Sequence, residues 1–138
     1  MLDRLKRRLG LSRPDRSEEK KLASDGSVPD RMKLAKSKET SPDILYYLAE
    51  HDEEASVRRA VAGNSSTPLQ ASSVLSKDSD IDVRLALAER LIHLLPQLSE
   101  DKQSQIYTFA VNALGALALD EVLKIRVALS SALKDHAH

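Results

Sequence analysis

Two stretches of the sequence share one pattern, and this pattern decides the fold. The first is SPDILYYLAEHD at residues 41–52, and the second is TPLQASSVLSKD at residues 67–78. The same shift along the chain relates VRRAVA at residues 57–62 to VRLALA at residues 83–88. A helix start, a proline, an apolar face, a turn aspartate and a Val-Arg pair therefore recur in register. This recurrence is typical of a helical repeat array.

The spacing between aspartate and arginine supports the repeat. An Asp precedes an Arg at one constant spacing in three pairs, which are Asp52/Arg58, Asp78/Arg84 and Asp120/Arg126. The third pair accompanies a further copy of the Val-Arg element, IRVA at residues 125–128. Because each Arg has an acidic residue at a fixed spacing, we expect these arginines to be structural.

Signals for helix starts and ends divide the repeats into short helices. The sequence SPD at residues 41–43 has Ser at the cap, Pro at the first position and Asp in the first turn. Thr67, with Gln70 in the first turn that follows, predicts a second start with a capping box. The Gly63–Asn64 pair between these starts predicts a helix end.

The remaining apolar periodicity is also helical. It predicts a short helix at residues 31–35 and a long amphipathic helix at residues 81–95, which Pro96 should terminate. A further helix is expected from a cap at residues 99–101 to about residue 119, and a last helix over about residues 121–134. Since no segment alternates with period two, the predicted fold class is all-α.

Each repeat copy is too small to bury its own apolar face, so stacking of copies is expected to bury one continuous core. Exposing a Leu or Val of this face would forfeit roughly 1.5–3 kcal/mol. The predicted core consists of Leu45, Leu48, Val57, Val61, Val74, Leu75, Val83 and Leu87. Ala60, Ala86 and Ala128 follow the Val-Arg pairs, where small side chains are expected to let neighbouring helices approach.

These residues resemble HEAT-type α-solenoids and, in the Ser/Thr-Pro and Asp-x5-Arg elements, the leucine-rich-repeat variant. Residues 83–91 and 119–129 also resemble a bacterial HEAT-like domain family of uncharacterised function. The resemblance covers about residues 30–135 and implies a short right-handed α-solenoid. It specifies the fold better than the function, because solenoids have many roles.

In such families the turn Asp and the helix Arg form a ladder between adjacent repeats. The resemblance therefore implies a structural ladder made of Asp52, Arg58, Asp78, Arg84, Asp120 and Arg126. One departure from the family pattern is the longer helix expected between Pro96 and Ala118, so strict periodicity is expected only up to Leu95.

The N-terminal part differs from the repeat region. We predict a basic and largely flexible segment at residues 1–29, with a mobile linker from residue 10 to about 28, followed by a repeat domain at residues 30–138. Residues 1–21 contain eight basic and four acidic side chains. Leu2, Leu5 and Leu9 would give a short helix an apolar stripe beside its cationic face. Two interpretations of residues 1–9 remain. The segment is either a solvated terminus, or it docks into a partner groove or, weakly, onto an anionic membrane surface.

Composition excludes most catalytic chemistries. The chain has no Cys, no Trp, only four scattered Gly and a formal net charge of zero. These counts exclude disulfides, cysteine-ligated metals and glycine-rich phosphate loops. No two of the four His have metal-ligand spacing, and Asp78, Asp80 and Asp82 lack the Gly of a calcium loop. We predict a non-enzymatic protein without catalytic residues, metal or cofactor.

Two function classes remain open. The favoured one is a cytoplasmic scaffold or adaptor for another protein. Its partner contacts are expected at Arg4, Lys6, Arg7, Arg8 and Arg59, the last of which is not part of the expected ladder. The alternative is a nucleic-acid-binding protein, because some alkylpurine DNA glycosylases also use HEAT-like repeats. The negative balance of residues 22–138 argues against it. The apolar C-terminal helix further predicts self-association or a longer array, and no transmembrane segment is expected.

Overall fold

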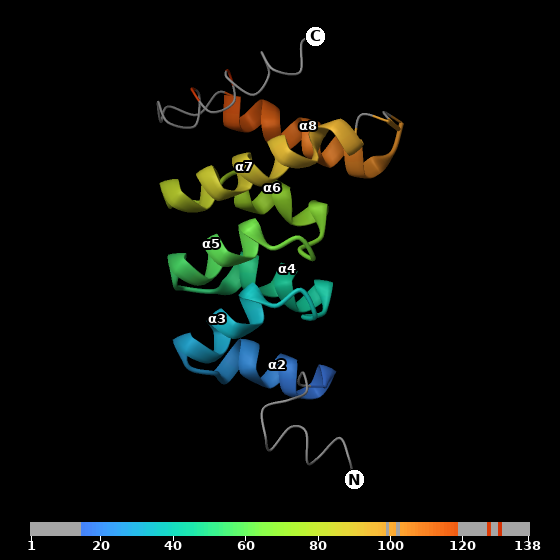
Figure 1. The fold of residues 1–138 in the computed structure, drawn as a ribbon. Helices are drawn as coiled ribbons and strands as arrows, with labels where there is room; N and C mark the ends of the chain where they lie inside the picture. Colours follow the sequence, from blue (N-terminus) through green and yellow to red (C-terminus); the bar gives the residue numbers. More distant parts are fainter. Residues whose placement is uncertain (1–14, 99, 102, 119–126, 128–129, 131–138) are drawn as a thin grey trace.

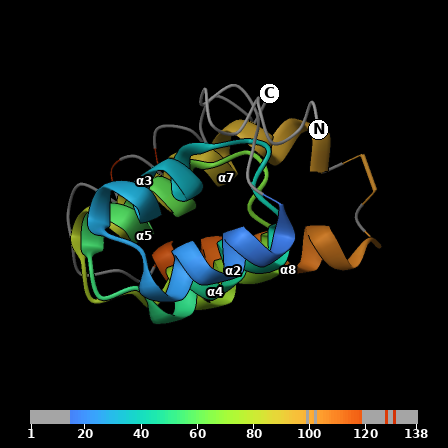
Figure 2. The same cartoon turned by 90° about the horizontal axis from the view of Figure 1, so that it is seen from below.

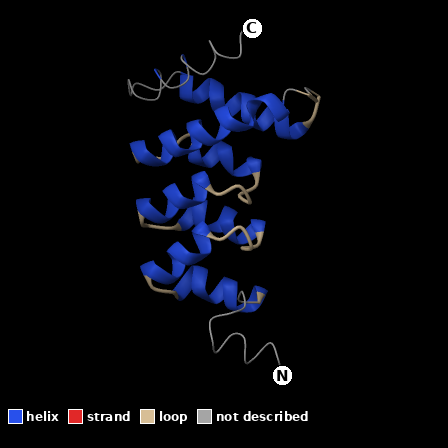
Figure 3. Ribbon diagram, viewed as in Figure 1, coloured by secondary structure: helices blue, strands red, loops and turns tan. Residues whose placement is uncertain are grey.

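The structure is a computed structural model that describes residues 15–98, 100–101, 103–118, 127 and 130. All regular secondary structure of these residues is helical, which confirms the predicted all-α class (Figure 3). In chain order the elements are α2 (Arg16–Asp25), α3 (Val28–Lys36), α4 (Pro42–His51), α5 (Ala55–Gly63), the 3-10 helix η1 (Leu69–Ala71), α6 (Ser72–Leu75), α7 (Ile81–Leu98) and α8 (Gln105–Ala118).

The helices form two layers. Helices α3, α5 and α7 lie side by side in one layer, and α2, α4, α6 and α8 follow one another in the second (Figures 1 and 2). The chain crosses between the layers at each turn, so we call α2 with α3 unit 1, α4 with α5 unit 2, and η1 and α6 with α7 unit 3. The most extensive helix contact joins α5 to α7, the equivalent helices of units 2 and 3.

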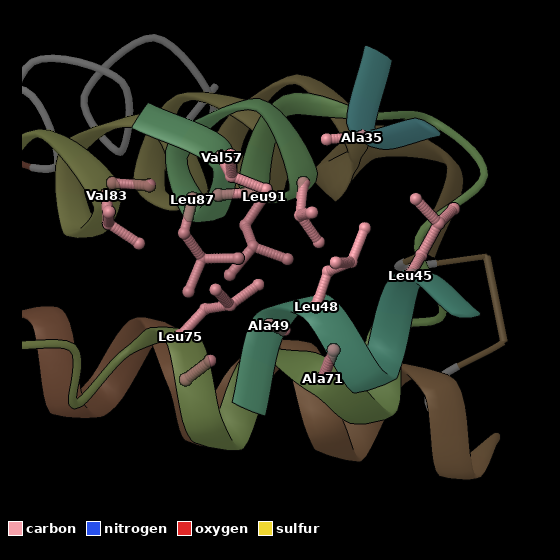
Figure 4. Close-up of a cluster of buried hydrophobic side chains, with 14 of the residues drawn as sticks. Ala35, Leu45, Leu48, Ala49, Val57, Ala71, Leu75, Val83, Leu87 and Leu91 are labelled. Carbon is pink, nitrogen blue, oxygen red and sulfur yellow. The ribbon is translucent and has the colours of Figure 1, made fainter. Parts of the chain in front are cut away.

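The core lies between the two layers. Leu48 of α4 and Leu75 of α6 face Leu87 and Leu91 of α7 in its centre (Figure 4), and all four side chains are fully buried. Seven of the eight predicted core residues are buried, and Val74 is half-buried because it lies at the edge of the short α6. The stacking of units therefore buries the apolar stripe that each unit alone would expose.

Residues 16–25, which the sequence assigned to a linker, form helix α2. The helix begins where Asp15 accepts a hydrogen bond from the backbone N–H of Glu18 at 2.9 Å. The assignment to a linker is wrong because α2 is stabilised by its cap and by one buried alanine, Ala23, rather than by a long apolar stripe. Among the described residues, the first helix therefore begins at Arg16.

Polar contacts attach α2 to α4. Arg16 Nη2 forms an ion pair with Asp43 Oδ2 at 2.6 Å. The buried carboxylate of Glu19 accepts a hydrogen bond from the backbone N–H of Ser41 at 3.3 Å, at the start of α4. A negative charge at this position is favourable because the first N–H groups of a helix are unpaired and carry the positive end of its dipole.

Helix α3 also begins earlier than predicted. Its start is a capping box in which the Ser27 hydroxyl accepts from the backbone N–H of Asp30, and the Asp30 carboxylate accepts from the backbone N–H of Ser27. Pro29 occupies the first turn, where its missing N–H costs nothing. Residues 24–30 resembled a linker because the capping residues Ser, Pro and Asp are the same residues that favour loops.

The predicted capping box of Thr67 and Gln70 is absent. Thr67 Oγ1 instead donates to the backbone carbonyl of Val61 at 2.7 Å, and Thr40 Oγ1 donates equivalently to Leu34 at 2.7 Å. Both hydroxyls therefore pair with a carbonyl near the end of the preceding helix rather than with the next helix start. The structural equivalent of Thr67 is Thr40 and not Ser41, so the alignment of the two copies slips by one position at this turn.

Two predicted boundaries near residue 96 are also wrong. Helix α7 continues through Pro96 to Leu98, because a proline this close to the end removes only one hydrogen bond before the helix stops. Helix α8 begins at Gln105 rather than at the predicted cap, with the Ser104 hydroxyl accepting from the backbone N–H of Ile106 at 3.1 Å. The helix predicted at residues 121–134 lies outside the described residues.

Gly26 is required by close packing between α2 and α3. A Cβ at this position would overlap the backbone carbonyl of Leu22 and lie 3.1 Å from the Asp30 Cβ. We expect Gly26→Ala to lower the free energy of unfolding by about 2 kcal/mol, because the backbone must shift to make room. Chemical denaturation followed by circular dichroism measures the change.

Gly115 provides the matched control for this substitution. A Cβ there would meet nothing within 4 Å, and the residue lies inside α8. Gly115→Ala should therefore stabilise the chain by up to about 1 kcal/mol through helix propensity. Equal effects of the two substitutions would contradict the packing role of Gly26.

Candidate partner-binding groove

Arg58 of α5 joins two units. Its Nε and Nη2 donate to the two carboxylate oxygens of Asp78 at 2.7 and 3.1 Å, while its Nη1 donates to the backbone carbonyl of Asp52 at 2.8 Å. Asp78 belongs to the turn of unit 3, and Asp52 precedes α5 in unit 2. The side chains of Arg58 and Asp78 are largely buried, with 14% and 6% of their surface exposed. This forked geometry fixes the guanidinium in one orientation.

The same arrangement occurs one unit earlier, at Arg31 of α3. Arg31 Nε pairs with Asp52 Oδ2 at 2.8 Å, and its Nη1 donates to the backbone carbonyl of Gly26 at 2.6 Å. Arg31 was not identified from the sequence, although Asp25 precedes it at the same spacing that relates Asp52 to Arg58 and Asp78 to Arg84. This spacing was the signal that could have located it.

The ladder thus runs forward along the chain, from Arg31 and Arg58 to the turn aspartates of the units that follow them. Arg84 repeats the backward contact, from its Nη1 to the carbonyl of Asp78 at 2.6 Å. In the predicted pairs Asp52/Arg58 and Asp78/Arg84, the arginine contacts the backbone of its Asp, and the carboxylate binds the arginine of the preceding unit. Asp120 and Arg126 lie outside the described residues.

The hydrogen-bonded carboxylates stabilise the charged arginines. The hydrogen bond with Asp78 raises the pKa of Arg58, and nearby carboxylate charges add to this effect against the cost of burial. Asp52 raises the pKa of Arg31 in the same way. Each aspartate is itself held by a nearby backbone N–H, of Glu54 for Asp52 and of Asp80 for Asp78. Arg31 and Arg58 are therefore structural, because hydrogen bonds hold each guanidinium between two units.

A second set of contacts links the units at their opposite edge. Asn64 Nδ2 donates to the backbone carbonyls of Ala35 and Ser37 in the preceding unit at 2.7 and 2.9 Å. Arg90, at the equivalent position of the next unit, donates in the same manner to the carbonyl of Thr67 at 2.7 Å. Burial lowers the pKa of Arg90, whose Nε and Nη1 are buried and have no hydrogen-bond partner among the described residues.

A groove of about 670 Å³ lies along the layer of α3, α5 and α7. Most of its apolar floor is made of small residues from units 2 and 3, which include Ala55, Ala60, Gly63 and Ala86, and Met32 of α3 adds one larger side chain. Ala60 and Ala86 were predicted to let helices approach, and they pack against the core while also lining this groove. The small side chains leave open space, since a Cβ at Gly63 would meet nothing within 4 Å.

Charged residues of both signs border the groove. Lys36 of α3 and Arg59 of α5 lie on one part of the groove border. Asp80, directly before α7, and Asp82 and Glu89 within α7 lie on the other part. Lys36, Arg59, Asp82 and Glu89 are exposed, and none of these four forms an ion pair with another described residue. The groove thus offers charges that the described part of its own chain does not neutralise.

Arg59 is the one predicted partner contact that the structure describes. It is exposed and lines the groove, beside the half-buried ladder residue Arg58 on the same helix. The other predicted contacts, Arg4, Lys6, Arg7 and Arg8, lie outside the described residues, as does the C-terminal helix predicted to self-associate.

The remaining polar residues show no catalytic arrangement in the described part of the chain. His51 is exposed at the end of α4, with its ring centroid 4.9 Å from that of Tyr47. Asp80 caps α7 through hydrogen bonds from the backbone N–H groups of Asp82 and Val83. Across the described ranges, no group of three His, Asp or Glu side chains could hold a metal ion.

Comparison of the chain with protein-family models, curated proteins and solved structures finds no match. None of the helices that the structure describes is long and apolar enough to cross a bilayer.

Proposed function

We propose that this protein is a non-catalytic scaffold or adaptor that binds another protein through the groove along α3, α5 and α7. The observation that carries the proposal is a set of exposed charges of both signs, unpaired within the described residues, around a floor of small residues. Electrostatic complementarity of this kind directs association and selects partners. We place the protein in the cytoplasm, as the sequence analysis expects.

We further propose that the fold is a right-handed α-solenoid of HEAT-like repeats. The paired helices in two layers support this assignment, and so does the forward ladder from Arg31 and Arg58 to the turn aspartates of the following units. In a solenoid the equivalent helices of successive units form one extended binding surface. The groove spans α3, α5 and α7, which are equivalent helices of three units.

The lining of the groove favours a polypeptide over a small molecule or nucleic acid. Small-molecule sites are usually lined by large apolar and aromatic side chains, whereas no aromatic residue lines this groove in the described part of the chain. A nucleic-acid surface should be basic, but three carboxylates border the groove against two cations. The glycosylase-like alternative therefore has less support than the scaffold.

Site-specific photo-crosslinking tests the proposal. A benzophenone amino acid at Ser56, which is exposed in the groove, should form an adduct with a protein partner in cells, and the same residue at Ser73 on α6 should not. Gly63→Trp should abolish the Ser56 adduct, because the indole fills the open space above the floor. Nuclease treatment should leave the adduct intact.

The control substitution is Gly115→Trp, which places the same side chain in open space on exposed α8, outside the groove. It should retain the adduct. An adduct that persists in Gly63→Trp, or that consists of nucleic acid, would refute the proposed function.

A further inference from the structure

The charges around the groove are segregated along the stack of units. The cationic side chains Lys36 and Arg59 belong to units 1 and 2, and the anionic side chains Asp82 and Glu89 belong to α7 of unit 3. Helix α5 lies between α3 and α7 (Figure 1). The groove therefore has a positive part and a negative part. A bound segment therefore meets charges of opposite sign at its two ends.

We infer that the partner is a polypeptide segment with two charge blocks, which lies with acidic side chains against Lys36 and Arg59 and basic side chains against Asp82 and Glu89. This inference rests on the proposed function, since it names the chemistry of the partner for the same groove. The reversed placement would bring like charges together, and such contacts exclude a ligand from that orientation.

We expect Asp80 to contribute less to binding of the partner segment than Asp82 and Glu89. Its Oδ1 already accepts hydrogen bonds from the backbone N–H groups of Asp82 and Val83 at 2.8 and 3.2 Å. Glu89 has no such partner among the described residues and is exposed on the groove. Glu89 on α7 and Arg59 on the neighbouring α5 are therefore suitable positions to test the order of the charges.

The floor explains why backbone and charge, rather than large apolar anchors, are expected to dominate recognition. Ala55, Ala60, Gly63 and Ala86 present little side-chain volume, so a partner backbone can approach closely. Exposed ion pairs are screened by salt. Binding should therefore weaken when the ionic strength is raised.

Selection of short random peptides on the immobilised full-length chain at low salt tests the inference. Peptides are retained for study if Gly63→Trp abolishes their binding and Gly115→Trp does not. We expect them to carry an acidic block and a basic block. Arg59→Glu should weaken binding about fivefold or more, because an exposed attraction becomes a repulsion.

A charge exchange gives the decisive comparison. Replacing the acidic block of a selected peptide with lysines should restore its binding to Arg59→Glu, and replacing the basic block with glutamates should restore its binding to Glu89→Lys. Circular dichroism confirms that each variant is folded. Ser73→Glu serves as the control for added charge outside the groove and should leave the affinity unchanged.

The outcomes separate the two proposals. Groove-dependent peptides without the two blocks, or peptides that bind Arg59→Glu equally well, would overturn this inference and leave the scaffold function standing. If no selected peptide is sensitive to Gly63→Trp, both the inference and the proposed function fail.

Discussion

Arg58→Ala is expected to lower the free energy of unfolding by about 3 kcal/mol, which is the range for breaking a buried ion pair. The substitution removes the partner of the Asp78 carboxylate, whose side chain is only 6% exposed, and also the donor to the backbone carbonyl of Asp52. Most of the cost is the desolvation of groups left without a partner. Urea denaturation of the full chain measures it.

The neighbouring Arg59→Ala is the control for this prediction. Arg59 is on the same helix, carries the same charge and is exposed without an ion pair to any described residue. Its replacement should change the free energy of unfolding by less than about 0.5 kcal/mol. Similar values for the two alanine variants would show that the ladder does not stabilise the fold.

Leu87→Ala is expected to have a comparable or larger effect, with a loss of about 3 kcal/mol or more. Leu87 of α7 is fully buried between the layers, close to Leu75 and Leu91 (Figure 4). Its truncation removes apolar contacts and leaves a cavity that helices held by the ladder on one edge cannot easily close.

Ile81→Ala on the same helix provides the comparison, because Ile81 is 46% exposed. Its loss should cost less than about 1 kcal/mol. If Leu87→Ala destabilised the chain no more than Ile81→Ala does, the two layers would not share the continuous core described above.

The turn aspartates and the core could be predicted because they depend on regular spacing. The recurrence of one pattern along the chain located Asp52 and Asp78, and helical periodicity located Leu48, Leu75 and Leu87. These signals are local and repeat along the chain. They do not require knowledge of which units touch.

The missed features depend on contacts between distant residues. Helix α2 is attached through Arg16 and Glu19, which look like ordinary solvated charges until their partners 27 and 22 residues away are known. The forward pairing of Arg58 with Asp78 was hidden by Asp52, which is closer in sequence. A constant spacing indicates a relationship, but it does not say which atoms pair.

The groove also could not be predicted from the sequence, although Arg59 was correctly expected to be exposed. Its lining comes from three helices that lie side by side, and its charges come from residues as far apart as Lys36 and Glu89. Alanine and glycine at these positions indicated close packing equally well. Only the arrangement of the layer distinguishes a tight helix contact from an open surface.

The double contact of each ladder arginine has a consequence for cooperativity. Arg58 binds its own unit through a backbone carbonyl and the next unit through a carboxylate, so it couples the unfolding of neighbours. In a linear array, the interface energies decide whether the chain melts as one block or frays from an end. Arg58 joins units 2 and 3, so weakening it should make the melting transition less cooperative. Hydrogen exchange would then show unit 1 and unit 2 opening together, while α7 opens separately.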